Sequence, residues 1–372
     1  MKKEYFTLAL SFFSCIACAG GTGTTVTSKF VITNRTIESA TISSTDSTMN
    51  YSDETGSGLY KIHDSYTDAN IEATKYGNQQ FGLLRNKSLV SIPLIGVNLR
   101  HTIIVNGKLA NSSVQIPGYT RVLLGGGKNN GCIQVSPIGY AGDIDTVVFT
   151  ITSSNDVTKD CSGNTGDYGF TPYHVPVQGL SRDFYLDIGR LQNDPVYRRA
   201  PPDTYVGTGT FMGEVLKNRV GNGYTPYYRN TITIVKNPYF EGVTMPSGDN
   251  VFDTRTTGGQ IKGNLVIPYV INGQFTPYNT ISLNVNSLNG FKLKSIVSSA
   301  EIPYSLSTTV GSQRVYPLAT DGKGAGSVTI SNLEAESYAI QGRFNADFSI
   351  DKNNAQTGDY SDILTAIFQI TL

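Results

Sequence analysis

Tryptophan is absent from this 372-residue sequence, and only three histidines occur in it. His63, His101 and His174 lie far apart, without the i, i+4 spacing that places two histidines on one helical face for a metal ion. The sequence also has no Gly-x-Ser-x-Gly motif, which would place a nucleophilic serine on a sharp turn. These absences argue against an enzyme, so we expect no catalytic residue, no metal site and no cofactor.

Charge is also scarce. The 29 Lys and Arg residues balance the 29 Asp and Glu residues, and charged residues make up 16% of the chain, below the roughly 25% of an average soluble domain. A neutral chain has no overall field to attract nucleic acid or an anionic membrane. Because 39% of the residues are hydrophobic, the chain can bury a core and disorder is not expected. We therefore expect no nucleic-acid partner. We also expect no membrane span, because no apolar run reaches the length that a span needs.

The first 19 residues have the pattern of a signal peptide. Lys2 and Lys3 precede an apolar stretch at residues 6–17, and Ala-Cys-Ala at 17–19 supplies small residues for cleavage. The stretch is shorter than a membrane span, which takes about 20 residues. We therefore expect export, with Gly20 as the first mature residue.

Four cysteines are present, and two of them fall within the signal peptide. Cys132 and Cys161 remain in the mature chain, an even pair in an oxidising compartment. The sequence therefore predicts a structural disulfide between them, which would stabilise the fold by roughly 3.5 kcal/mol through the loop that it closes.

Glycine, proline and tyrosine are abundant, with 39, 15 and 22 residues. Short apolar runs, for example at 89–92, 103–105 and 147–151, are bounded by Gly, Asn, Asp or Pro. Strands at this spacing, separated by turn residues, are typical of β-sandwiches. The predicted fold class is all-β, with two β-sandwich domains.

The last ten residues form the clearest strand of the sequence. One face of it carries Leu364, Ala366, Phe368, Ile370 and Leu372. Residues 338–350 alternate in the same way, and 351–359 form a polar turn between the two segments. We expect these two segments to form an antiparallel pair.

The sequence divides at Lys236-Asn237-Pro238. Proline cannot donate a hydrogen bond to a sheet, so the strand at 231–235 should end there. The predicted domains are residues 20–236 and residues 237–372, both of plausible size.

Aromatic residues and arginines mix in the segment 168–239. Tyrosine rings can stack on sugar faces, and guanidinium groups can bind acidic or hydroxyl groups of a glycan. The proline-rich turn at 200–203 places some of these side chains on loops, where binding residues concentrate. For any single residue, packing of the tyrosine or solvation of the arginine is the competing interpretation. The candidate receptor-binding residues are Arg198, Arg199, Arg219, Tyr224, Tyr227, Tyr228 and Arg229.

Two stretches of the chain resemble the tip adhesins of chaperone–usher fimbriae, of the enterobacterial colonisation-factor type. Residues 201–208 (PPDTYVGT), with 211–216 and 231–235, are similar to the closing strands of such adhesin domains. Residues 358–362 (GDYSD), which lead into the final strand, are similar to the ending of a fimbrial subunit.

The resemblance implies an N-terminal adhesin domain, residues 20–236, and a C-terminal pilin domain, residues 237–372. The pilin domain would be an incomplete immunoglobulin-like sandwich that lacks one strand. A periplasmic chaperone and then a neighbouring pilin subunit would supply this strand by donor-strand complementation. Leu364, Ala366, Phe368, Ile370 and Leu372 would line the groove, with the Leu372 carboxylate held by chaperone cations.

The same resemblance implies an outer-membrane usher as a further partner and a host glycoprotein or glycolipid as the receptor. The protein would pass through the periplasm to the cell surface. Two other functions stay open: a structural minor fimbrial subunit without receptor activity, and an unrelated exported β-sandwich that acts on glycans. Residues 20–32 alternate as well, and we interpret them as the first strand of the adhesin domain rather than as a donor strand.

Overall fold

The structure is a computed structural model. It describes residues 24–44, 48–71, 78–83, 89–119, 132–136, 144–153, 156–159, 164–169, 177–211, 214–218, 223–224, 228–311, 314–331 and 339–371. Within these ranges, side chains are described for 24–44, 49–65, 89–111, 156–159, 181–211, 228–311, 314–331 and 339–371. The predicted signal peptide, residues 1–19, lies outside the described residues.

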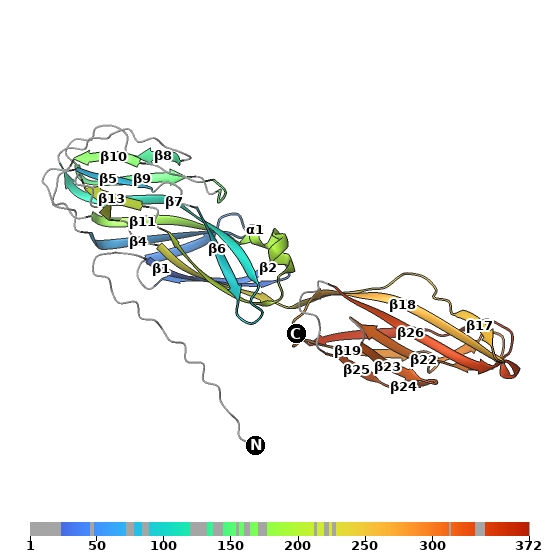
Figure 1. The fold of residues 1–372 in the computed structure, drawn as a ribbon. Coiled ribbons are helices and arrows are strands. Elements are labelled where there is room, and N and C mark those ends of the chain that lie inside the picture. The colour runs from blue at the N-terminus through green and yellow to red at the C-terminus, as the bar shows by residue number, and fades with distance from the viewer. Residues whose placement is uncertain are drawn as a thin grey trace, which may run out of the picture.

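Strands dominate the described chain, as the sequence predicts, and the predicted runs at 89–92, 103–105 and 147–151 all lie in strands (Figure 1). The strands that precede Pro238 are β1 (Thr24–Thr33), β2 (Thr36–Ser44), β3 (Thr48–Asp53), β4 (Leu59–Ile71), β5 (Asn78–Leu83), β6 (Leu89–Gly96), β7 (Thr102–Tyr119), β8 (Cys132–Ser136), β9 (Ile144–Ser153), β10 (Asn164–Gly169), β11 (Val177–Asp187), β12 (Asp203–Phe211), β13 (Glu214–Asn218), β14 (Gly223–Tyr224) and β15 (Tyr228–Asn237).

The strands that follow Pro238 are β16 (Tyr239–Thr244), β17 (Asp253–Thr257), β18 (Gln260–Gln274), β19 (Thr280–Ser287), β20 (Lys292–Ser295), β21 (Glu301–Pro303), β22 (Ser305–Val310), β23 (Arg314–Thr320), β24 (Lys323–Gly324), β25 (Ser327–Ile330), β26 (Ala339–Asp351), β27 (Tyr360–Ser361) and β28 (Leu364–Thr371). The helices are α1 (Ile188–Asn193), α2 (Pro195–Arg199) and the short 3₁₀ helix η1 (Lys352–Asn354). No described helix has both the length and the apolar character that a membrane crossing needs.

The first domain is built around one long sheet with the order β2-β1-β15-β12-β6-β7-β11-β4-β3, to which β9 and β8 attach at β7. The two end strands of this sheet, β2 and β3, lie close together. The Tyr51 hydroxyl on β3 donates a hydrogen bond to the Ala40 carbonyl on β2, at 3.0 Å. Apolar side chains from all parts of the sheet fill the interior, among them Phe30, Ile62 and Phe184. The separate sheet β10-β5-β13-β14 lies at the end of this domain (Figure 1).

Strand β1 lies inside the long sheet of the first domain. It pairs in parallel with β15 and antiparallel with β2, and Val26, Phe30 and Ile32 are completely buried. Residues 24–32 therefore form the first strand of this domain, as we expected, and residues 20–23 lie outside the described part of the chain.

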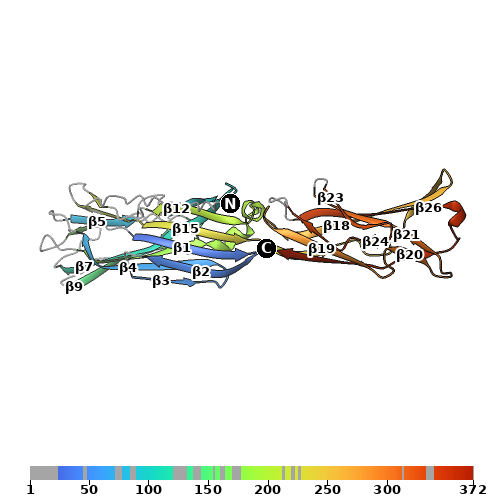
Figure 2. The same cartoon turned by 90° about the horizontal axis from the view of Figure 1, so that it is seen from below.

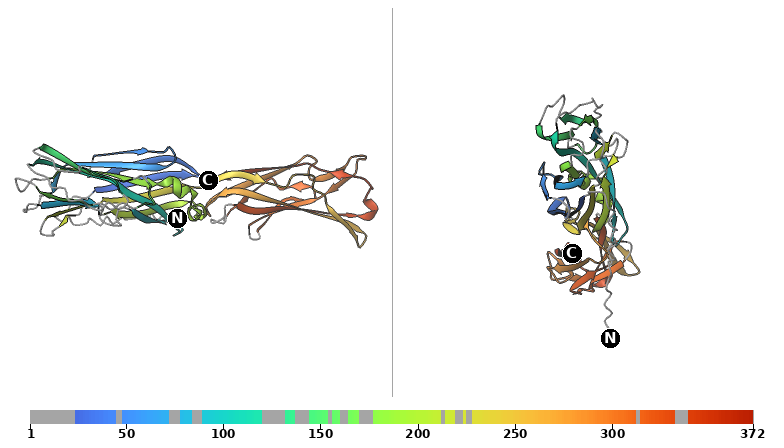
Figure 3. Two further views of the ribbon diagram at one scale, coloured as in Figure 1. Left: turned by 90° about the horizontal axis from the view of Figure 1, so that it is seen from above. Right: turned by 90° about the vertical axis from the view of Figure 1, so that its left-hand side faces the viewer.

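The second domain contains three sheets, with the orders β16-β18-β26-β22-β23-β24, β25-β19-β28 and β21-β20-β27; β17 attaches to β18. Its core is separate from that of the first domain and draws on buried residues between 269 and 348. Figures 1 and 2 show the two elongated domains end to end, with the final strand running back toward the junction. Two further views in Figure 3 show the same arrangement. The exact domain boundary at 236/237 stays a prediction, although β15 does end directly before Pro238.

The predicted pairing of the last two strands is wrong. Strand β26 pairs with β18 and β22, whereas β28 pairs with β19 in the other sheet. The two strands instead belong to opposite layers of one core, where the rings of Tyr269 on β18 and Phe368 on β28 are 5.4 Å apart. The alternation was assigned correctly, but alternation does not identify the neighbour of a strand.

The PPDTYVGT stretch has a structural role in the first domain. The Asp203 carboxylate accepts hydrogen bonds from the backbone N–H groups of Asn98 and Leu99, at 3.0 and 2.9 Å, and so holds the β6–β7 turn against β12. The Tyr205 hydroxyl donates to the Pro201 carbonyl at 2.6 Å. At Gly207 a Cβ would collide with the Pro93 carbonyl oxygen, so only glycine allows this close approach.

The GDYSD stretch anchors the start of β28. The Asp362 carboxylate accepts hydrogen bonds from the hydroxyls of Ser287 and Tyr304, both at 2.6 Å, and from the Asn289 N–H at 3.0 Å. Burial raises the pKa of the Tyr304 hydroxyl, and the adjacent Asp362 charge raises it further, so this hydroxyl stays a donor at neutral pH. These hydrogen bonds therefore hold the start of β28 against the rest of the second domain.

The predicted disulfide is not tested by this structure. Cys132 is the first residue of β8, and Cys161 lies outside the described residues. The bridge between them stays a prediction.

Candidate functional site

Strand β28 offers one hydrogen-bonding edge to a partner. Among the described residues it pairs with β19 alone, so the backbone groups on its other side have no strand beside them. An unpaired edge is a template for strand addition. The final strand is thus the first candidate site.

The core-facing side of β28 is not fully covered. Leu364, Ala366, Phe368 and Ile370 pack against the core of the second domain, yet all four are only half-buried. We call these four residues the terminal strip. Their outward neighbours Thr365, Ile367, Gln369 and Thr371 are exposed, so the predicted division of the strand into two faces is confirmed.

The opposite layer shows the same incomplete cover. On β18 the core-facing residues Ile261, Leu265 and Ile267 are half-buried, whereas Tyr269 and Ile271 further along the strand are buried. These half-buried apolar residues pack against the same core as the terminal strip. The apolar surface left open therefore belongs to both layers of the second domain. Leu372, the last predicted groove residue, lies outside the described residues.

The second candidate site lies at the junction of the two domains, where helix α2 ends. Asp194 caps this helix by accepting a hydrogen bond from the Val196 N–H at 2.6 Å, and Pro195 occupies its first position. The proline-rich turn predicted at 200–203 follows directly. Arg198 and Arg199 therefore lie in the last helical turn rather than on a loop, which corrects our expectation for them.

Lys236, near the end of β15, binds the carbonyl end of helix α2. Its buried ammonium donates hydrogen bonds to the carbonyl oxygens of Tyr197 at 2.7 Å and Ala200 at 2.5 Å, and it lies 4.5 Å from the centre of the Tyr197 ring. Carbonyl oxygens at a helix C-terminus favour a cation. Burial has the opposite effect and lowers the pKa of Lys236 to about 7.

Direct hydrogen bonds cross the junction. The Gln274 side chain on β18 donates to the Arg198 carbonyl at 2.6 Å, and the Asn34 side chain donates to the Glu241 carboxylate on β16 at 3.0 Å. Each bond joins a residue of the first domain to one of the second. The end of helix α2 is thus held from both sides.

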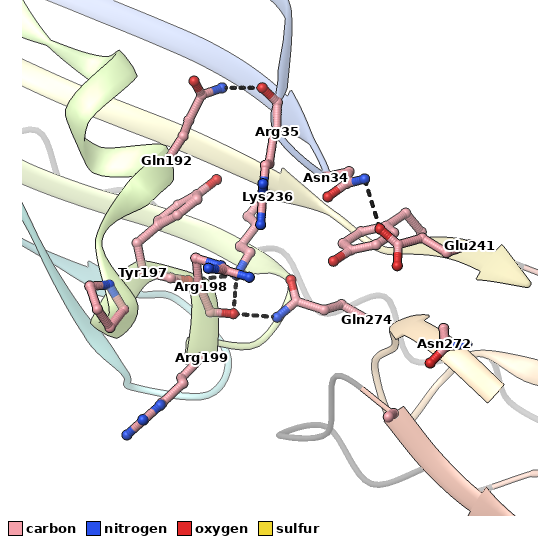
Figure 4. A pocket seen from close by; sticks show the side chains of 13 residues that line it. Asn34, Arg35, Gln192, Tyr197, Arg198, Arg199, Lys236, Glu241, Asn272 and Gln274 are labelled. Carbon is pink, nitrogen blue, oxygen red and sulfur yellow. Dashed lines mark hydrogen bonds between the residues drawn. The ribbon is translucent and has the colours of Figure 1, made fainter. Parts of the chain in front are cut away.

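A cavity of about 470 Å³ opens at this junction (Figure 4). It is lined from both domains, by the residues Asn34, Arg35, Gln192, Pro195, Tyr197, Arg198, Arg199, Lys236, Tyr239, Glu241, Asn272, Gln274 and Ala339. Arginine side chains from the 34–35 turn and from α2 contribute positive charge, and Glu241 is the one carboxylate among the lining residues. The cavity is therefore polar and mainly cationic.

The structure brings together only two of the predicted receptor-binding residues. Arg198 and Arg199 are exposed and line the junction cavity. Arg229 is exposed on β15 and is not one of the lining residues. Arg219 and Tyr227 lie outside the described residues, and of Tyr224 only the strand position in β14 is described.

Tyr228 is a core residue, so its prediction as a receptor contact is wrong. Its side chain is completely buried, and its ring lies 4.9 Å from that of Phe184 and 5.9 Å from that of Phe211. The alternation of the strand that it begins places it on the inward face, together with Ile232 and Ile234. A receptor cannot reach it.

Sequence reasoning missed the residues that complete the junction cavity from distant parts of the chain. Arg35, Gln192 and Gln274 meet there although more than 80 residues separate the last two. No local pattern marks them. Lys236 alone carried a signal, because a lysine in the inward register of a strand that reads Ile-x-Ile-x-Lys is unusual.

Another cluster lies on the first domain, outside both sites. The Asp183 carboxylate accepts hydrogen bonds from Asn111 at 2.5 Å and contacts the His63 ring nitrogen at 2.6 Å and the Lys61 ammonium at 3.3 Å. These contacts tie β4, β7 and β11 together across the sheet. Within the described ranges no group of three His, Cys, Asp or Glu side chains is placed to hold a metal ion.

No family model matches the sequence, and no curated protein matches it. Solved structures give similarities. The chain is similar to chaperone–tip adhesin complexes. One is the complex that is vital for synergistic activation of CFA/I fimbriae biogenesis, with 14% sequence identity, 94% of this chain and 97% of that chain covered, and a TM-score of 0.43. Another is the chaperone–tip adhesion subunit pre-assembly complex of the archaic chaperone-usher Csu pili of Acinetobacter baumannii, with 10% identity, coverage of 94% and 99%, and a TM-score of 0.31.

Proposed function

We propose that the protein is a fimbrial adhesin whose second domain, residues 237–372, is completed by a strand from another chain. The observation that carries this proposal is the state of β28, which has one strand neighbour among the described residues and a half-buried apolar strip facing the core. A strand added along the free edge of β28 would gain backbone hydrogen bonds. Its alternating apolar side chains would cover the terminal strip.

The direction of β28 suits assembly into a fibre. The strand runs back toward the junction with the first domain, so an added antiparallel strand would leave at the opposite end of the second domain (Figure 2). The body of the donating subunit would then lie at that end. The first domain, residues 20–236, would stay free at the tip of the fibre.

The partners follow from this proposal. A periplasmic chaperone fills the open edge first, because an uncovered edge with apolar side chains aggregates. A neighbouring pilin subunit then replaces the chaperone at the outer-membrane usher, and the protein reaches the cell surface. The first domain attaches to a host glycoprotein or glycolipid.

The strand-addition part is tested by co-expression of the chain with its cognate chaperone. Two neighbouring substitutions make a matched pair: Phe368→Asp places a charge in the terminal strip, and Gln369→Asp places the same charge on the exposed face of β28. We expect Phe368→Asp and removal of residues 363–372 to abolish co-purification, and Gln369→Asp to preserve it. Equal co-purification of all variants would contradict the proposal.

Adhesion is tested separately, on cells that assemble fimbriae with and without this chain. If fimbriae form without it but no longer bind host cells, the chain is the adhesin. If binding to host cells persists, it is a structural minor subunit instead. Hydrolysis of a glycan by the purified chain would support the third alternative, an unrelated protein that acts on glycans.

A further inference from the structure

The junction cavity has the size of a small-ligand site, and its lining is polar. Its volume of about 470 Å³ lies within the range of known ligand pockets, roughly 300–1,000 Å³. Both domains contribute to its wall, so it exists only while they keep this arrangement. Pockets between domains are a common place for ligands.

Within the described part of the chain, the arginines of the cavity are not paired with carboxylates. Arg35, Arg198 and Arg199 are exposed, and among the described residues none of them has a carboxylate within ion-pair distance. Glu241, the one acidic residue in the wall, is engaged by the Asn34 amide. A guanidinium group binds a carboxylate or a sulfate through two parallel hydrogen bonds. The wall is therefore suited to an anion.

Other groups in the wall suit a polyhydroxylated ligand. Asn34 and Asn272 present amides whose NH₂ groups already donate to Glu241 and Thr244, and whose carbonyl oxygens can accept hydrogen bonds from ligand hydroxyls. Tyr197 is almost completely buried, and its hydroxyl, which points toward the space between Gln192 and Arg35 (Figure 4), has no hydrogen-bond partner among the described residues. A buried hydroxyl without a partner costs free energy that an additional acceptor would recover.

We propose that the junction cavity binds an acidic saccharide, whose carboxylate or sulfate is held by Arg35 and Arg198, the two arginines whose side chains point into the cavity (Figure 4), and whose hydroxyl groups contact the amides of the wall. The inference rests on the proposed function, because it assigns the glycan chemistry and the position of a receptor site. Of the sequence-based candidates it uses Arg198, whereas Tyr228 is buried and Arg229 is not a lining residue. A ligand held by groups from both domains also joins them.

The test uses the mature chain in complex with its chaperone, and measures binding of three probes by calorimetry. Sialyllactose carries a carboxylate, sulfated lactose carries a sulfate, and lactose carries neither. We expect at least one acidic probe to bind at least tenfold more tightly than lactose. The comparison of the two acidic probes distinguishes carboxylate from sulfate as the preferred group.

Three variants place the binding. The double variant Arg35→Gln/Arg198→Gln should weaken binding of the acidic probe at least tenfold. Glu241→Gln keeps an oxygen that accepts from Asn34 but removes the competing charge, so it should strengthen binding about two- to fivefold. Arg190→Gln, an exposed arginine of α1 outside the cavity, is the control and should change nothing.

The proposal is overturned if no acidic probe binds, if lactose binds equally well, or if the double variant binds like the parent chain. Because all the substituted side chains are exposed, an unchanged unfolding midpoint will show that the fold of each variant is intact. Chaperone binding is measured on the same preparations. If it persists while no saccharide binds, this inference fails and the strand-addition proposal stands.

Discussion

The two domains differ in how the edge strands of their sheets are covered. In the first domain the ends of the long sheet meet at Tyr51 and Ala40, and the core-facing Phe30 of strand β1 is completely buried between two strand neighbours. In the second domain β28 has one strand neighbour among the described residues, and its core-facing Phe368 is half-buried. Each phenylalanine has one polar and one apolar neighbour in its strand: Lys29 and Val31 flank Phe30, and Gln369 and Ile367 flank Phe368. The difference in burial therefore comes from the missing neighbour and not from the sequence of the strand.

The largest expected effect comes from truncating these two phenylalanines. Phe30→Ala should lower the free energy of unfolding of the first domain by about 3–5 kcal/mol, the usual loss for a buried phenylalanine. Phe368→Ala should lower that of the second domain by only about half as much, because its ring is already partly in solvent. Denaturant unfolding with hydrogen exchange resolves the two domains.

Binding of a complementing strand should remove the difference between the two stability losses. With a complementing strand along β28, the loss from Phe368→Ala should approach that from Phe30→Ala, because the ring is then buried. A loss from Phe368→Ala that is the same with and without the strand would show that the terminal strip is not covered by it.

A smaller effect is expected from the anchor of β28. Asp362→Ala removes the acceptor of hydrogen bonds from Ser287, Tyr304 and the Asn289 N–H. Since the donors are left in a partly buried place, the second domain should lose about 2–3 kcal/mol of stability. Chemical denaturation measures this loss, and the exposed Asp359→Ala serves as the control. An equal loss in both variants would contradict the assigned role of Asp362.

A slightly smaller effect, caused by steric overlap rather than by lost hydrogen bonds, is expected in the first domain at Gly207. Gly207→Ala drives a methyl group into the Pro93 carbonyl, and such overpacking typically lowers stability by about 1–3 kcal/mol. The unfolding midpoint of the first domain should fall while that of the second stays unchanged. A fall in both midpoints would mean that the domains do not unfold independently.

The smallest effect concerns the junction and depends on pH. The folded pKa of Lys236 is about 7 and that of an unfolded lysine is about 10.4, so between these values unfolding takes up a proton. The free energy of unfolding should therefore rise with pH from 7 to 9, by about 1 kcal/mol after allowance for the carbonyl groups that favour the ammonium. Lys236→Met should abolish this rise, which unfolding curves at pH 7, 8 and 9 will measure. A rise that persists in the variant would assign it to another group.

The sequence predicted those features that depend on neighbours along the chain. The alternation of 363–372 placed the terminal strip on the correct face, and Pro238 marked the end of β15. It failed where distant segments meet. Residues 338–350 and 363–372 were expected to pair but lie in opposite layers, because a connection that contains η1 and β27 carries the chain from one sheet to the other.

The candidate sites show the same contrast between features set by neighbours along the chain and features that depend on distant segments. Arg198 and Arg199 were found because arginine, tyrosine and proline cluster locally, whereas Arg35 and Gln274 reach the junction cavity only through the fold. Tyr228 was misassigned for the opposite reason: it belongs to a cluster of aromatic and basic residues in the sequence, but the register of β15 turns it into the core.

Amide hydrogen exchange along β28, with β1 as the internal reference, tests strand addition most directly. Without a partner, the amides of β28 should exchange much faster than those of β1, and a complementing strand or the chaperone should slow exchange in β28 while leaving β1 unchanged. Exchange in β28 that is already as slow as in β1, and that no added strand alters, would contradict the account.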